Sequence, residues 1–218
     1  LLLENTVRSF FEAGNQYLTD SDGERYRCHY DLHTAIRDSA HEKFAVYPYL
    51  HGGKWNKQQF EILKAMGVTT FLLMEKPATT FSYYSSKQHG AHAFTVELGK
   101  VRPFGQNDQP KFAAAKQTLV DLLQGKPFSG DDFNQDNYQI KTVYREIIKH
   151  NDTFELCFAD DVANFTEYQK GDVLAKEDGK DIVVDVSGEA IVFPNANVAN
   201  GQRALLTVIP KDISEHLE

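Results

Sequence analysis

Two residues in this sequence have the chemistry and the positions expected of a metal-assisted hydrolytic site, His33 and Glu97. His33 follows Arg25–Tyr30, a run rich in aromatic and β-compatible residues, and Glu97 ends the short apolar run Ala93–Val96. Both runs predict strands. Ligands in open α/β sheets bind beyond the carboxyl ends of strands. We therefore expect His33 and Glu97 to face one crevice.

Each residue type suits one part of that chemistry. A neutral imidazole suits zinc, and Asp31, two residues earlier and on the same face of a regular strand, could orient the ring or the backbone around it. The apolar run before Glu97 makes an exposed, merely solubilising carboxylate surprising there. A buried or half-buried carboxylate has a raised pKa, which suits a group that takes a proton from water and gives it to a departing amine. The structural alternative is a satisfied histidine at a strand end and an ordinary carboxylate.

The segments around these residues resemble a known family. Asp31–Arg37 (Asp-Leu-His-Thr-Ala-Ile-Arg) and Thr95–Gly105 (Thr-Val-Glu-Leu-Gly-Lys-Val-Arg-Pro-Phe-Gly) are similar to the succinylglutamate desuccinylase and aspartoacylase family of zinc carboxypeptidase-like hydrolases. The resemblance runs from about Leu2 to Pro210. It implies that His33 is a zinc ligand, that Glu97 is the general base, and that the complete enzyme binds one Zn2+ per chain. The implied reaction hydrolyses N-succinylglutamate to succinate and glutamate, late in arginine catabolism by the succinyl route.

The sequence departs from the family pattern at the metal site. The resemblance implies an upstream His-x-x-Glu that supplies the other two zinc ligands, but no histidine here has a glutamate three residues later. The family's nearby block of arginines and asparagines is missing too, and the chain begins without a methionine, inside a predicted helix. We therefore expect this chain to be the later part of a longer enzyme, with an incomplete active site.

Substrate recognition requires cations, because N-succinylglutamate carries three carboxylates. Arg37 is the first candidate, since its guanidinium could fork onto a carboxylate four residues after His33. Alternatively, Arg37 pairs with Asp38, Glu42 or a backbone carbonyl and only holds the loop. The other candidate substrate-binding residues are Tyr83, Lys87, Arg102, Asn195 and Asn197. We interpret the run from Ser82 to Lys87 as a polar loop over the pocket; simple packing and solvated surface charge are the alternatives.

The order of predicted elements favours an α/β fold. Helical and strand-like runs alternate in the first part of the chain, which predicts a mostly parallel or mixed sheet flanked by helices, and the resemblance implies a zinc-carboxypeptidase-like arrangement. The predicted helices are Leu2–Ala13, Lys57–Met66 and Pro110–Gln124, and the predicted strands are Arg25–Leu32, Phe44–Tyr47, Thr70–Met74 and His92–Glu97.

The later part of the chain is mostly β. The predicted strands are Thr142–Ile148, Phe154–Phe158, Asp181–Val186, Ala190–Phe193 and Ala204–Ile209. We predict a hydrolase domain over residues 1–138 and a small barrel-like β domain over 139–218, with a return to the main domain open near the end. The run from Gly171 to Val192 is similar to the hairpins of biotinyl and lipoyl carrier domains, but it has no lysine at the hairpin tip where such domains are modified.

Composition excludes some classes of protein. A net charge of -8 without a concentrated Lys/Arg tract argues against a nucleic-acid surface. No apolar stretch has membrane-spanning length, and no signal peptide is visible, so the cytoplasm is the default location. The two cysteines, Cys28 and Cys157, lack metal-type spacing, and we predict buried free thiols. The expected partner is a small anionic substrate, and a homo-oligomer is left open.

Two functional classes remain. The first is a zinc-dependent amidohydrolase acting on N-succinylglutamate or on another N-acyl amino acid such as N-acetylaspartate. The second is a metal-free binding or structural module of the same fold. An upstream His-x-x-Glu in a longer sequence would favour the first class, and its absence there would favour the second.

Overall fold

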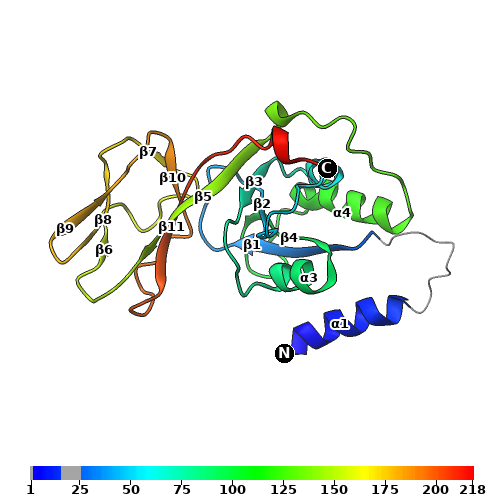
Figure 1. The fold of residues 1–218 in the computed structure, drawn as a ribbon, viewed down its shortest axis with the longest axis horizontal. Helices are drawn as coiled ribbons and strands as arrows, with labels where there is room; N and C mark the ends of the chain where they lie inside the picture. The colour runs from blue at the N-terminus through cyan, green and yellow to red at the C-terminus, as the bar shows by residue number, and fades with distance from the viewer. Residues whose placement is uncertain (1, 16–25) are drawn as a thin grey trace.

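The structure is a computed structural model that describes residues 2–15 and 26–218 (Figure 1). Its helices are α1 (Leu2–Asn15), α2 (Lys57–Ala65), α3 (Phe81–His89) and α4 (Gln109–Leu123), with single 3-10 turns η1 (Gln135–Asn137) and η2 (Ser214–His216). Its strands are β1 (Cys28–Ala35), β2 (Phe44–Tyr47), β3 (Thr70–Leu73), β4 (His92–Lys100), β5 (Gln139–Ile148), β6 (Glu155–Leu156), β7 (Glu167–Tyr168), β8 (Val173–Glu177), β9 (Lys180–Val183), β10 (Glu189–Val192) and β11 (Arg203–Pro210).

A mixed sheet runs through the molecule. The described residues form an eight-stranded sheet in the order β1-β4-β2-β3-β5-β11-β10-β7, and a separate three-stranded sheet in the order β6-β8-β9. The pairs β1/β4, β2/β3 and β3/β5 are parallel, whereas β2/β4 and the pairs beyond β5 are antiparallel. The predicted mixed α/β sheet flanked by helices is therefore confirmed.

Apolar side chains assign the helices to the two faces of the sheet. On one face, Phe94 and Val96 of β4 pack in a core with Phe60 and Leu63 of α2 and with residues of α4. On the other face, α3 lies over β1 and β4. Since side chains alternate along a strand, the odd-numbered residues of β1 before its bulge, such as His33, point to the α3 side.

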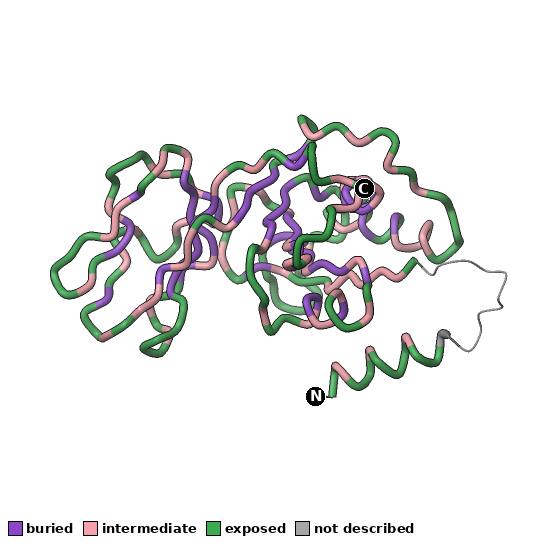
Figure 2. Tube along the Cα trace, in the orientation of Figure 1, coloured by how far each residue is buried: buried purple, intermediate pink, exposed green. Residues whose placement is uncertain are grey.

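The β-rich part of the chain has its own core but shares the main sheet. One cluster, which includes Leu174, Ile191 and Leu205, lies within that part, and a second cluster joins it to the main domain (Figure 2). Strand β5 pairs with β3 near its start and with β11 along the rest of its length. The division predicted at 138/139 stays a prediction, because one continuous sheet runs through both parts.

The end of the chain lies against the main domain. Leu217 forms an isolated bridge with Trp55, and Ile213 is buried in the core that α2 and α4 cover. No helix among the described residues is both long enough and apolar enough to span a bilayer.

The structure corrects several predicted elements. Residues predicted as a polar loop form α3, whose first turn is capped by Thr80 and whose last is ended by Gly90 at φ 61°. The strand predicted from Arg25 starts at Cys28 among the described residues, and Arg25 itself lies outside them. Strands β7 and β8 were not among the predicted strands. The prediction of buried thiols is wrong for Cys157, which is exposed just after the two-residue strand β6.

Candidate metal and catalytic site

His33 and Glu97 come together because their strands are parallel neighbours. The register of β1 and β4 pairs His33 with Glu97 and Asp31 with Thr95. Paired residues on adjacent strands project to the same face, with Cβ atoms about 5 Å apart. Three side chains with site chemistry, Asp31, His33 and Glu97, therefore share one face at the carboxyl ends of β1 and β4.

A β-bulge follows the pair directly. Two steps along β1, from His33 to Ala35, match three steps along β4, from Glu97 to Lys100. Within the bulge Gly99 has a φ of 127°, a conformation that side chains disfavour. Bulges bend a strand and redirect side chains, and they are common beside active sites. The backbone conformation of the bulge therefore explains why a glycine stands two residues after Glu97.

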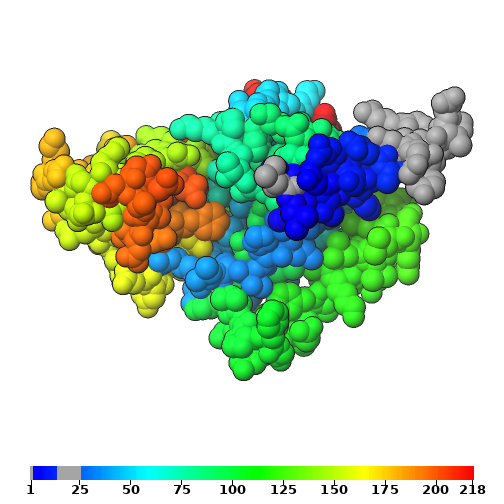
Figure 3. All heavy atoms as spheres, turned by 90° about the horizontal axis from the view of Figure 1, so that it is seen from below, coloured from blue at the N-terminus to red at the C-terminus, as the bar shows by residue number. Residues whose placement is uncertain are grey.

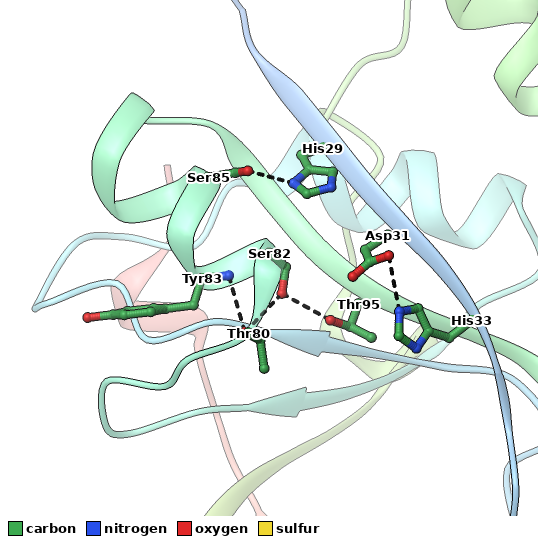
Figure 4. A network of polar contacts seen from close by, with 8 residues as sticks. All are labelled: His29, Asp31, His33, Thr80, Ser82, Tyr83, Ser85 and Thr95. Atoms are coloured by element: carbon green, nitrogen blue, oxygen red, sulfur yellow. Dashed lines mark hydrogen bonds and ion pairs between the residues drawn. The ribbon is translucent and has the colours of Figure 1, made fainter. Parts of the chain in front are cut away.

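The Asp31 carboxylate contacts the His33 ring. Asp31 Oδ1 lies 3.0 Å from His33 Nε2, and the His33 side chain is 46% exposed (Figure 4). A neutral imidazole that donates its Nε2 hydrogen to Asp31 has its lone pair on Nδ1. In that tautomer Nδ1 is the ring nitrogen available to bind a metal ion.

Glu97 is more buried than Asp31 and His33. Its residue is 8% exposed, and its Oε2 has no hydrogen-bond partner in the part of the chain that the structure describes. Burial raises the pKa of the Glu97 carboxyl, His33 opposes that shift, and Asp31 adds to it. A carboxylate with a raised pKa accepts and returns a proton closer to neutral pH than an exposed one does.

Helix α3 covers the part of this face before the site through polar contacts. Ser85 Oγ lies 2.7 Å from His29 Nδ1, and Ser82 Oγ lies 3.0 Å from Thr95 Oγ1 (Figure 4). His29 is on the same strand and face as His33, but its ring contacts Ser85 of α3. The polar contacts fix α3 against β1 and β4 and leave His33 beyond the helix.

Comparisons with known proteins show the family of this chain. The family profile described as "Succinylglutamate desuccinylase/Aspartoacylase catalytic domain" matches residues 4–123, and the "AstE/AspA barrel-sandwich hybrid domain" matches residues 136–211. The chain belongs to the succinylglutamate desuccinylase/aspartoacylase family.

Individual members of the family resemble the chain over most of its length. Succinylglutamate desuccinylase of Pseudoalteromonas atlantica is 53% identical over 95% of this chain and 57% of its own length, and that of Idiomarina loihiensis is 51% identical over 95% and 59%. Crystal structures of the enzymes from Chromobacterium violaceum and Vibrio parahaemolyticus each give a TM-score of 0.80, at 38% and 32% identity, and cover 97% and 95% of this chain. The chain spans 60% of each of those structures and less than two thirds of the curated relatives.

The zinc ion expected for this family would find part of its ligand set here. The described residues contain no group of three His, Cys, Asp or Glu side chains arranged to hold a metal ion. His33 fits as one nitrogen donor because its ring is exposed and oriented, and Glu97 fits as a nearby base because its buried Oε2 is unpartnered. Structural and catalytic zinc sites in proteins use three or four protein ligands, so a zinc ion bound at His33 would require ligands besides that residue.

The six predicted substrate-binding residues are spread over several places. Arg37 donates to main-chain carbonyls of the β-rich part, among them those of Val162 at 2.8 Å and Pro194 at 3.3 Å. These contacts match the structural alternative for Arg37. Asn195 and Asn197 are exposed in the turn that begins at Pro194.

The remaining candidates contact other side chains or are exposed. The Tyr83 hydroxyl contacts His51 Nε2 at 2.9 Å, and the Lys87 ammonium lies 5.7 Å from the Tyr83 ring centroid. Arg102 is exposed after β4. These contacts favour packing and surface charge for Tyr83 and Lys87, while the recognition role of each residue stays a prediction.

One buried polar residue, Asn164, had no signal in the sequence. Asn164 is 1% exposed and forms hydrogen bonds to the segment that follows His33. Its bonds to Asp38 and Ala40 join residues more than a hundred positions apart in the chain, so no local pattern could reveal them.

Proposed function

We propose that this chain supplies one zinc ligand and the general base of a succinylglutamate desuccinylase. The observation that carries the proposal is the pairing of exposed His33 with buried, unpartnered Glu97 at the carboxyl ends of β1 and β4. It is supported by the 53% identity to an enzyme of that name. The reaction is the hydrolysis of the amide bond of N-succinyl-L-glutamate to succinate and L-glutamate.

The chain's own residues divide the chemistry between them. Asp31 holds the His33 ring so that one nitrogen is available to a metal ion. Glu97 removes a proton from the attacking water and returns it to the departing amine nitrogen of glutamate. A bound zinc ion supplies Lewis-acid polarisation of the amide carbonyl and makes the water more acidic.

Burial supports the role of Glu97 as a base. The low-dielectric surroundings that raise its pKa also strengthen its interaction with a cationic partner. Activity should therefore decline as the pH falls through the raised pKa, because the protonated carboxyl cannot accept a proton. The reaction would belong to arginine catabolism in the cytoplasm, and both placements remain predictions.

A substrate panel with metal exchange tests the proposal. The complete protein is assayed with N-succinylglutamate and N-acetylaspartate, as purified, after treatment with a chelator, and after zinc is restored. We expect succinate release with a kcat/KM at least about tenfold above that for N-acetylaspartate, loss of activity with the chelator, and recovery with zinc.

The other outcomes identify the alternatives. A preference for N-acetylaspartate would indicate a deacylase with a different acyl specificity. No hydrolysis of either substrate in a zinc-loaded, folded protein would favour the metal-free binding or structural module.

A further inference from the structure

The segment directly after β1 is fastened to the β-rich part of the chain. Arg37 Nη1 donates to the main-chain carbonyls of Asp160 and, at 2.8 Å, Val162, and Arg37 Nη2 donates to that of Pro194 at 3.3 Å. In the space-filling view, the blue atoms of this segment lie against yellow and orange atoms of the β-rich part (Figure 3). A single guanidinium thus binds two loops that are far apart in the sequence.

Asn164 also binds the segment that follows β1. Its backbone N–H donates to the Asp38 carbonyl at 2.8 Å, and its carbonyl accepts from the Ala40 N–H at 2.8 Å. Its side-chain Oδ1 accepts the Phe193 N–H at 2.8 Å. We call Arg37 and Asn164 together the interdomain clamp. Both residues bind the segment after His33 to the loops around 160–165 and 193–194.

Two aromatic residues next to the clamp have strained backbones and pack against Phe44. Phe165 and Phe193 have φ values of 64° and 52°, which cost on the order of 1–3 kcal/mol each in a non-glycine residue. Their rings lie 5.0 Å and 6.0 Å from the ring of Phe44. Such strain persists only where the surroundings fix it, and the clamp contacts supply that fixation.

Phe44 connects this cluster to the site. Its register partner on β4 is Glu97, so the two side chains are neighbours on one face. The clamp is therefore connected to the site in two ways. Arg37 follows His33 by four residues in the chain, and Phe44, which the cluster contacts, lies beside Glu97.

We propose that the interdomain clamp positions His33 and Glu97 for hydrolysis, so that the β-rich part of the chain is a working part of the active site. Arg37 and Asn164 are positioning residues in this proposal, because no contact with substrate is needed. The proposal rests on the proposed function, because its test measures that hydrolysis. An arginine suits the task because its planar fork of donors reaches several carbonyls at once, which a lysine cannot do.

The test compares Arg37 with a matched arginine in the complete protein. Arg145 also binds the β-rich part, through Glu189 at 2.8 Å, Asp185 at 2.9 Å and the Val183 carbonyl, but it does not contact the segment after His33. The variants are Arg37→Ala, Arg37→Lys, Asn164→Ala and Arg145→Ala. Each is assayed with N-succinylglutamate and with an analogue in which one succinyl or glutamyl carboxylate is an amide, and its Tm is measured.

The clamp predicts a selective loss of turnover. Displacing catalytic groups by about 1 Å can cost up to about a hundredfold in rate, so Arg37→Ala should lower kcat about tenfold or more. Asn164→Ala removes only the side-chain contact with the Phe193 N–H and keeps the main-chain bonds to Asp38 and Ala40, so it should lower kcat by a smaller factor. KM should change much less, and both substrates should be affected alike. Arg37→Lys should lie between wild type and Arg37→Ala. Arg145→Ala should lower Tm while kcat stays at the wild-type value.

Three results would overturn the clamp or the function beneath it. If Arg37→Ala and Arg37→Lys lower Tm as Arg145→Ala does but keep kcat, Arg37 is only structural. If they raise KM for N-succinylglutamate more than for the amide analogue while kcat is kept, Arg37 binds substrate instead. An inactive wild type would reject the proposed function itself, which the first two results do not. Arg37→Lys and Asn164→Ala keep the test informative if Arg37→Ala does not fold.

Discussion

Three side chains carry the proposed chemistry, and each depends on its neighbour. His33 is exposed but oriented by Asp31, and Glu97 is buried with one oxygen unpartnered. An unpartnered buried carboxylate oxygen costs free energy, so its persistence beside a histidine at the end of two strands points to a functional role. Glu97 also has the clearest electrostatic signature of the three, because burial raises its pKa.

The first prediction concerns His33. In the complete protein, His33→Ala should reduce bound zinc from about one ion per chain to a small fraction, measured by elemental analysis after dialysis. The control is His29→Ala, which removes an imidazole from the same face of the same strand. Because His29 is held by Ser85 at 2.7 Å, that variant should keep its zinc. Equal zinc content in wild type and His33→Ala would remove His33 from the metal site.

The sequence was informative about single residues only where local pattern and chemistry coincide. His33 and Glu97 end short apolar runs, so their convergence followed from the expectation of parallel neighbouring strands, which β1 and β4 fulfil. Arg37 has no such signal. Its acceptors lie at least 123 residues later in the chain, and only folding brings them to its guanidinium.

Among the elements, β4 and its bulge place Glu97. The strand was predicted to end at Glu97 but continues to Lys100, because the bulge at Gly99 keeps it paired with β1. Helix α3 was missed because Phe81–His89 has no clear helical repeat of apolar residues; its buried positions include serines that contact His29 and Thr95. The two signals that do mark α3, Thr80 before it and Gly90 after it, are cap residues.

The bulge gives the second prediction. Gly99→Ala should cost about 1–2 kcal/mol of stability, because φ 127° is strained for any side chain. It should also lower kcat about tenfold, since relaxing the bulge shifts Glu97. A Cβ at Gly99 would have Glu42 at 3.8 Å as its nearest neighbour, so the effect is conformational and not a clash.

Gly90→Ala is the matched control for Gly99→Ala. Gly90 also has a positive φ, 61°, and nothing lies within 4 Å of an added Cβ there. It ends α3 and is not part of the bulge that follows Glu97. Thermal unfolding and steady-state kinetics of both variants check the prediction. Equal kcat in the two variants would show that the bulge does not position the base.

For the molecule as a whole, the β-rich part is joined to the part that carries His33 and Glu97. The continuous sheet through β5, the junction core around Phe44 and the clamp all join it to the hydrolase domain. The change in sequence pattern predicted two parts, and that division stays a prediction. The sequence could not reveal their contact surface, because that surface consists of pairings between distant segments. Strand β7 has two residues, too few for a periodic pattern to reveal it.

One comparison in the complete protein decides whether this chain carries the catalytic base of a zinc-dependent desuccinylase. Succinate release from N-succinylglutamate is measured for wild type and Glu97→Gln, with the zinc content of the same samples determined in parallel. Loss of a general base predicts a kcat about 10²–10⁴ lower in Glu97→Gln, with zinc content unchanged. A kcat equal to that of wild type at equal zinc content would make Glu97 a structural carboxylate and contradict the proposed mechanism.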